Sequence, residues 1–133
     1  MILIPVSVGE LLDKISILYI KKTKISDVDK LRKVETELEK LRLSAVNLLE
    51  DNEVNDLYKQ LLDVNFELWK VEDKLRLLES NYKFGDEFVT FARSVYILND
   101  KRFAIKDEIN RITNSEIQEV KSYVKYDNRT KEI

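Results

Sequence analysis

The chain has 133 residues, of which 36% are charged, and its formal net charge at pH 7 is −2. It holds only two glycines and one proline, a composition that argues against strands, sharp turns and phosphate-binding loops and favours long helices. This length can bury one core, and the weakly acidic balance attracts neither nucleic acid nor an anionic membrane. We therefore predict a single all-α domain over residues 1–133, a compact helical bundle with no nucleic-acid partner and no membrane partner.

The chain contains no cysteine and no histidine. Disulfides, nucleophile systems that need histidine and the usual zinc sites are therefore excluded. Walker and dinucleotide-binding glycine motifs are also missing. Magnesium or manganese held by carboxylates stays open as an alternative, although Glu116 and Glu119 supply only one half of the paired acidic motifs of all-α nucleotide pyrophosphohydrolases. We predict no metal and no other cofactor, and we favour a protein that is not an enzyme.

Residues 1–6, MILIPV, are apolar and stand before the first helical pattern. They lack the basic region, the long apolar stretch and the cleavage site of a signal peptide. No apolar run in the chain approaches the ~20 residues that a membrane span needs. We expect an extended segment laid over the bundle, in a soluble and cytoplasmic protein.

The first helix is predicted to begin at Ser7, which forms a capping-box pair with Glu10, and to end near Lys24. Its inward stripe is expected to consist of Val8, Leu11, Leu12, Ile15, Leu18 and Tyr19. The opposite face is expected to be solvated and carries Glu10, Asp13, Lys14 and Lys21.

Two heptad patterns follow, over residues 31–48 and 57–78. We expect Ser26 to cap the first of these helices and Asn55 to cap the second, after a tight connection at residues 51–55. Because a short connection makes neighbouring helices antiparallel, residues 26–80 are predicted to form a long antiparallel helical hairpin with coiled-coil-like packing. The same apolar seams could also pack against those of another copy of the chain, so formation of a homo-oligomer remains an alternative.

Two further helices complete the prediction. Gly85 is expected to take a positive φ, and Asp86 to cap a helix that ends near Thr113. Ser115 and Gln118 fit another capping box, for a short last helix to about Tyr126. The total is then about five helices, followed by a frayed polar tail at residues 127–133.

Polar side chains interrupt the apolar stripes of the third and fourth predicted helices. Arg102 falls inside the stripe of the fourth helix, and Glu72 lies on the border of the third. If the two polar borders face each other, nine side chains form one candidate ligand-binding site, consisting of Asn65, Trp69, Glu72, Arg76, Arg93, Tyr96, Asn99, Arg102 and Lys106.

Several interpretations of this site stay open. Glu72 could pair with Arg102 or Arg76 and fix the helix register, as buried polar groups do in other bundles. Alternatively, Arg76, Arg102 and Lys106 could bind a phosphate or carboxylate, for which the guanidinium fork is well suited. The same surface could also dock a protein partner, or its long side chains could simply reach solvent.

Four ordered blocks stand out along the chain: IPVSVGELLDKISIL, LWKVEDKLR, FARSVYILNDKRFAIKDEIN and EVKSY. In these blocks the chain resembles an uncharacterised family of short bacterial and phage proteins, a domain of unknown function. The resemblance implies a small helical protein without an established activity, found in marine and other bacteria and in some of their phages. It supplies no catalytic residues.

Two hypotheses about function follow. The first is a non-enzymatic interaction or assembly factor that binds a protein partner or itself, which in a phage would be host-directed or act in assembly. The second is a binding protein or enzyme for an anionic, phosphorylated small molecule at the polar site. They differ in what Arg102 does: it either has its anion already, in Glu72, or receives one from a ligand.

Overall fold

The computed structural model describes residues 1–126 and confirms the all-α class. These residues form four helices and no strand: α1 (Val8–Lys24), α2 (Val28–Leu49), α3 (Asn52–Ser80) and α4 (Asp86–Ile112). The expected fifth helix is not among them. The predicted tail at residues 127–133 lies outside the described residues.

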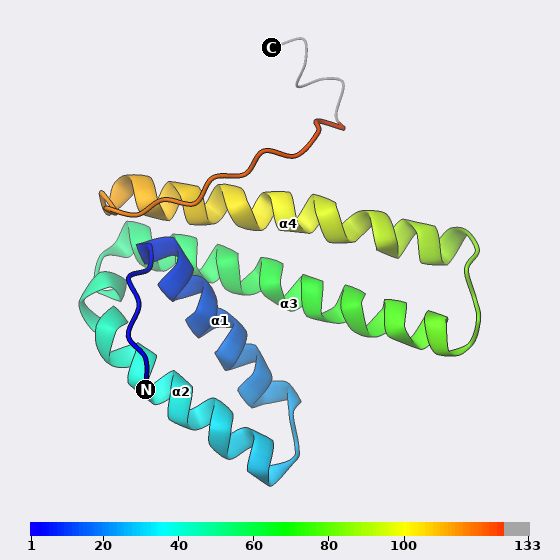
Figure 1. Ribbon diagram of the computed structural model, residues 1–133, viewed down its shortest axis with the longest axis horizontal. Helices are drawn as coiled ribbons and strands as arrows, with labels where there is room; N and C mark the ends of the chain where they lie inside the picture. Colours follow the sequence, from blue (N-terminus) through cyan, green and yellow to red (C-terminus); the bar gives the residue numbers. More distant parts are fainter. Residues whose placement is uncertain (127–133) are drawn as a thin grey trace.

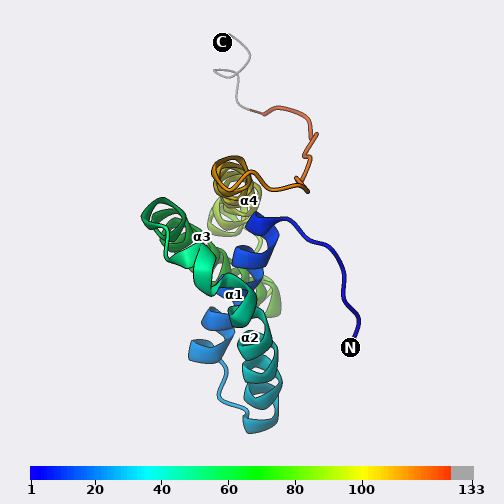
Figure 2. The same ribbon diagram turned by 90° about the vertical axis from the view of Figure 1, so that its left-hand side faces the viewer.

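The two longest helices, α3 and α4, run antiparallel along each other (Figure 1). Helix α1 packs against all three other helices, and α2 packs mainly against α1. Figure 2 shows the α3–α4 pair above α1 and α2, with residues 1–6 leaving the bundle at its side. One apolar cluster, with residues from all four helices, joins these layers.

The prediction that residues 26–80 form a long antiparallel hairpin, with α2 and α3 packed along their length, is wrong. Helices α2 and α3 meet near their connection and then diverge (Figure 1). Three heptad residues of α2, Val34, Leu38 and Ala45, are buried in the cluster to which α1 contributes Leu12 and Ile15. A heptad pattern shows that a helix packs along one stripe, but it does not say which helix fills the groove.

The helix starts agree with the sequence to within a few residues. Ser7 caps α1 as predicted, since its Oγ accepts a hydrogen bond of 3.1 Å from the Glu10 amide. The caps of α2 and α3 are Asp27 and Asp51, rather than Ser26 and Asn55. Each aspartate stands directly before the first helical residue, where its carboxylate reaches the free amides of the first turn.

The connection between α3 and α4 also differs from expectation. Gly85 has a φ of −80° and is itself the residue before the helix, whereas Asp86 is already helical. The left-handed residue of this connection is Tyr82, with a φ of 53°. Helix α4 ends at Ile112, close to the predicted end.

The last predicted helix is absent, because Ser115 is used in another way. Its Oγ accepts a hydrogen bond from the Val8 amide and donates one to the Ile117 carbonyl, so it does not cap a helix. Residues 116–126, which we call the C-terminal segment, instead double back along α4 as non-helical chain (Figure 1). Among the described residues, no helix combines the length and the apolar character needed to cross a membrane.

Candidate functional site

Asp13 is the centre of a buried polar network. Its side chain, expected on a solvated face, is fully buried. One oxygen accepts a hydrogen bond of 2.9 Å from Arg102 Nε, and the other pairs with Arg102 Nη2. Of the two predicted partners of Glu72, Arg102 is therefore excluded, because it has a buried partner from α1.

The network joins three helices. Asn65, on α3, donates from Nδ2 to Asp13 Oδ1 at 2.8 Å and to Ser16 Oγ at 2.7 Å. Ser16 in turn donates to the Asp13 carbonyl at 2.7 Å. The buried carboxylate thus receives donors from both α3 and α4, which offsets the cost of removing it from water.

The sequence contained a signal for this second buried face of α1. Gly9, Asp13, Ser16 and Ile20 follow one another at steps of four, three and four residues, and all four are buried. This is heptad spacing, but the first three residues are small or polar, so a search for large apolar side chains overlooks the pattern. Tyr19, expected to face inward, is instead about half exposed.

The start of α1 lies directly against α4. The Gly9 amide donates to Asn110 Oδ1 at 2.7 Å. A Cβ at Gly9 would lie only 2.6 Å from the carbonyl oxygen of Lys106 and 3.0 Å from Asn110 Oδ1. Glycine is needed here because of this close approach and not because of a special backbone angle.

Lys106 is the second cation of the network and is 5% exposed. Its Nζ lies 2.9 Å from Glu10 Oε2, 3.0 Å from Glu119 Oε2 and 3.9 Å from Asp13 Oδ2. Burial lowers its pKa, but the hydrogen bonds to Glu10 and Glu119 outweigh this effect, so the pKa is raised. The pKa of Arg102 is also raised, chiefly by its hydrogen bonds to Asp13. Both groups are therefore charged at neutral pH.

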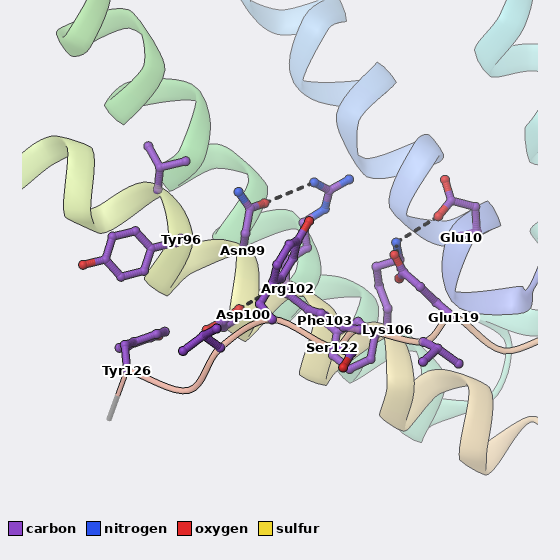
Figure 3. Close-up of a pocket in the computed structure, with 15 residues that line it drawn as sticks. Glu10, Tyr96, Asn99, Asp100, Arg102, Phe103, Lys106, Glu119, Ser122 and Tyr126 are labelled. Carbon is purple, nitrogen blue, oxygen red and sulfur yellow. Dashed lines mark hydrogen bonds and ion pairs between the residues drawn. The ribbon is translucent and has the colours of Figure 1, made fainter. Parts of the chain in front are cut away.

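The C-terminal segment covers a cavity of about 870 Å³ on α4, which we call the C-terminal cavity (Figure 3). Besides Glu119, this segment contributes Lys121, which pairs with Asp100, and Tyr126, whose ring lies 5.0 Å from that of Tyr96. Hydrogen bonds from Lys121 and Tyr126 lower the pKa of Asp100. The cations around this cavity, Arg102, Lys106 and Lys121, all have carboxylate partners within the chain.

A second cavity, of about 460 Å³, lies between α1, α3 and α4 and is called the three-helix cavity below. The structure brings six of the nine predicted site residues together here: Asn65, Trp69, Glu72, Arg76, Asn99 and Arg102. Side chains from the two polar borders thus line one cavity, although Lys106, which was predicted to join them, lies outside it. What the sequence missed is the contribution of α1, with Ile17 and Ile20 on the apolar side.

The other three predicted residues lie elsewhere. Tyr96 and Lys106 line the C-terminal cavity, to which Asn99 and Arg102 also extend. Arg93 is exposed and lines neither cavity. Glu72 pairs with Arg76, four residues further along α3, which was one of the predicted alternatives.

The described residues contain no cluster of side chains that could bind a metal ion. Among residues 1–126, no three acidic side chains are grouped closely enough to hold a metal ion. The expectation of a protein without a metal or other cofactor stays a prediction.

Comparison with known proteins gives one finding, at the level of the family. No curated protein and no solved structure matches this chain. A family model described as "Family of unknown function (DUF6165)" matches residues 2–129. Since this match covers nearly the whole chain, the protein belongs to that family of unknown function.

Proposed function

We propose that the protein is a non-enzymatic interaction protein that associates with another polypeptide chain, in the first place a copy of itself, through residues 1–4. The observation that carries this proposal is the exposure of four consecutive apolar side chains. Met1, Ile2, Leu3 and Ile4 are between 69% and 95% exposed. An exposed apolar run of this kind is typical of a binding surface.

The backbone of the segment supports the same function. Residues 1–4 are extended and make no hydrogen bond with the rest of the described chain. Extended chain with free amide and carbonyl groups can pair with a second strand, and its alternate side chains can then fill pockets on the partner. Pro5, which lacks an amide hydrogen, limits such pairing to the residues before it.

The C-terminal segment gives further support. It is also non-helical, and Val120, Tyr123 and Val124 on it are largely exposed. Two non-helical segments with exposed apolar side chains on one small helical bundle fit a protein that builds an assembly better than one that turns over a substrate. An assembly role, as the resemblance to phage proteins implies, would use these segments.

The first experiment measures molecular mass in solution by light scattering after gel filtration. We expect the full chain to exceed its monomer mass of 15.8 kDa in a concentration-dependent way. The double variant Ile2→Ser/Ile4→Ser should return the mass to that of the monomer, because it removes apolar surface without touching the bundle.

The matched control is the double variant Val28→Ser/Leu43→Ser, which removes two other exposed apolar side chains, both on α2. It should associate like the unaltered chain. A monomer over a roughly hundredfold range of concentration, or equal effects of the two double variants, would contradict the proposal.

A further inference from the structure

The guanidinium of Arg102 is only partly used by the protein. Asp13 occupies the edge formed by Nε and Nη2, and Nη1 makes only a long contact of 3.4 Å with Asn99 Oδ1. Arg102 lines the three-helix cavity and its side chain is 28% exposed. Because Asp13 holds the group in a fixed orientation, its remaining donors are preorganised for a ligand in that cavity.

Two amides beside Arg102 also have unused polar atoms. Asn65 is 5% exposed, and its Nδ2 donates hydrogen bonds to Asp13 and Ser16. Its Oδ1 accepts no hydrogen bond from the described residues. Asn99 accepts from Arg102 through Oδ1, and its Nδ2 makes no hydrogen bond within residues 1–126. The polar wall of the three-helix cavity thus offers donors and an acceptor side by side.

The opposite wall is apolar. It consists of Ile17 and Ile20 from α1 with Leu68 and Trp69 from α3. The volume of about 460 Å³ lies within the range of roughly 300–1,000 Å³ that small-molecule sites occupy. An apolar wall facing a few convergent polar groups is the usual composition of such a site.

The charges around the cavity indicate the class of ligand. The lining carries two guanidinium groups, of Arg76 and Arg102, and two carboxylates, of Glu72 and Asp73. Glu72 pairs with Arg76, and Arg102 pairs with Asp13, whereas Asp73 makes no ion pair among the described residues. The charges of the lining therefore balance, which disfavours a phosphorylated ligand, because a dianion would leave the site with an excess of negative charge.

We propose that the three-helix cavity binds a small zwitterion with an apolar body, such as a free aliphatic amino acid. Its carboxylate takes the unused donors of Arg102 and Asn99, and its ammonium group takes the Asp73 carboxylate. Its aliphatic side chain lies against Ile17, Ile20 and Leu68. This site does not involve residues 1–4, so it stands or falls separately from the proposed interaction function.

Trp69 makes the test specific to the cavity, since it is the single tryptophan of the chain and lines this cavity. Its fluorescence is measured during titration with each of the twenty free amino acids. We expect a saturable change with leucine and its aliphatic relatives. N-acetyl-leucine, which has no ammonium group, and leucinamide, which has no carboxylate, should each bind about tenfold more weakly or worse. Inorganic phosphate should leave the fluorescence unchanged.

Two variants assign the contacts. Asp73→Asn should weaken leucine binding about tenfold and leave the binding of N-acetyl-leucine unchanged, because that analogue has no ammonium group to lose a partner. Asn99→Ala should weaken leucine but not leucinamide, by the same logic applied to the carboxylate. The matched controls are Asp56→Asn and Asn47→Ala, which are exposed helix positions away from the cavity and should bind leucine normally.

The proposal is overturned if none of the twenty amino acids changes the fluorescence of a protein that circular dichroism shows to be folded. It is also overturned if the two analogues bind as tightly as leucine, since the zwitterion would then not be what is recognised. A response to phosphate in place of leucine would identify an anion site instead.

Discussion

The Asp13 carboxylate is fully buried, so removing its cation should be costly. Arg102→Met should lower the free energy of unfolding by about 3–5 kcal/mol, because it takes the main cation from a buried carboxylate and leaves only Lys106 Nζ, 3.9 Å away. The double variant Asp13→Leu/Arg102→Met should recover much of this loss, since an apolar pair replaces the ion pair. Urea unfolding followed by circular dichroism measures both changes.

The control for this pair is Arg111→Met. Arg111 also forms an ion pair with a carboxylate, Glu108, but both side chains lie on the exposed side of α4. Solvent screens such a pair, so the unfolding midpoint should stay close to that of the unaltered chain. Equal losses for Arg102→Met and Arg111→Met would mean that burial of Asp13 has no part in the effect.

The two glycines give a second prediction at the scale of single residues. Gly9→Ala should destabilise the protein by about 1–3 kcal/mol, because the new Cβ would lie 2.6 Å from the backbone oxygen of Lys106. Gly85→Ala should have an effect near zero, since nothing lies within 4 Å of its Cβ and its φ is −80°. Thermal unfolding of the two variants side by side checks the contrast, and a stable Gly9→Ala protein would contradict the close packing of α1 on α4.

At the scale of elements, the C-terminal segment should detach from α4 in acid. The hydrogen bonds from Lys121 and Tyr126 lower the pKa of Asp100, so this link stabilises the segment above the ordinary aspartate pKa of about 3.9. The stabilisation is lost as the pH falls through the lowered pKa of the folded state. The ring resonances of Tyr96 and Tyr126 in NMR spectra should report the loss, because these rings are in contact.

The control for this acid transition is Lys121→Met. It removes the main partner of Asp100 at every pH, so the tyrosine resonances should already be close to their detached positions near neutral pH. Resonances that stay unchanged from neutral pH to below pH ~3 in the unaltered chain would show that the ion pair does not hold the segment.

The start of α1 could be predicted from sequence because its capping is local, and the other three starts were predicted to within a few residues although their caps were assigned to the wrong side chains. Ser7 satisfies the Glu10 amide within one turn, and no distant residue is needed. The fate of Ser115 could not be predicted in the same way. Its hydroxyl accepts from the Val8 amide, a residue that is near only once α1 lies against α4. The capping-box spacing at Ser115 is real in sequence, but a tertiary contact replaces it.

In the candidate site, too, the local features could be predicted from sequence and the tertiary contacts could not. Six of the nine predicted residues line one cavity because α3 and α4 are neighbours and their helical periodicity fixes which sides face each other. The part that sequence reasoning could not supply is the third wall. Helix α1 contacts three helices, so its second face is buried, and a carboxylate that looked solvated became the partner of Arg102.

At the scale of the whole molecule, the two proposed functions use separate parts of the protein. The proposed interaction surface is the extended segment at residues 1–4, and the proposed ligand cavity lies between α1, α3 and α4. Changes in the segment should therefore leave the leucine response of Trp69 intact. The double variant Ile2→Ser/Ile4→Ser tests this directly in the fluorescence titration, and loss of that response would show that the two parts are coupled.

The contact between Asp13 and Arg102 spans 89 positions of the chain, and this has a consequence for how the protein is made. Synthesis runs from the first residue to the last at about 5–20 residues per second, so α1 leaves the ribosome long before α4. Until α4 follows, the carboxylate of Asp13 has no cation to pair with, and the polar face of α1 stays in water. Of the four described helices, α1 is therefore synthesised first but completely buried late, because its packing is finished only after translation has passed residue 110, whose side-chain oxygen accepts a hydrogen bond from the Gly9 amide.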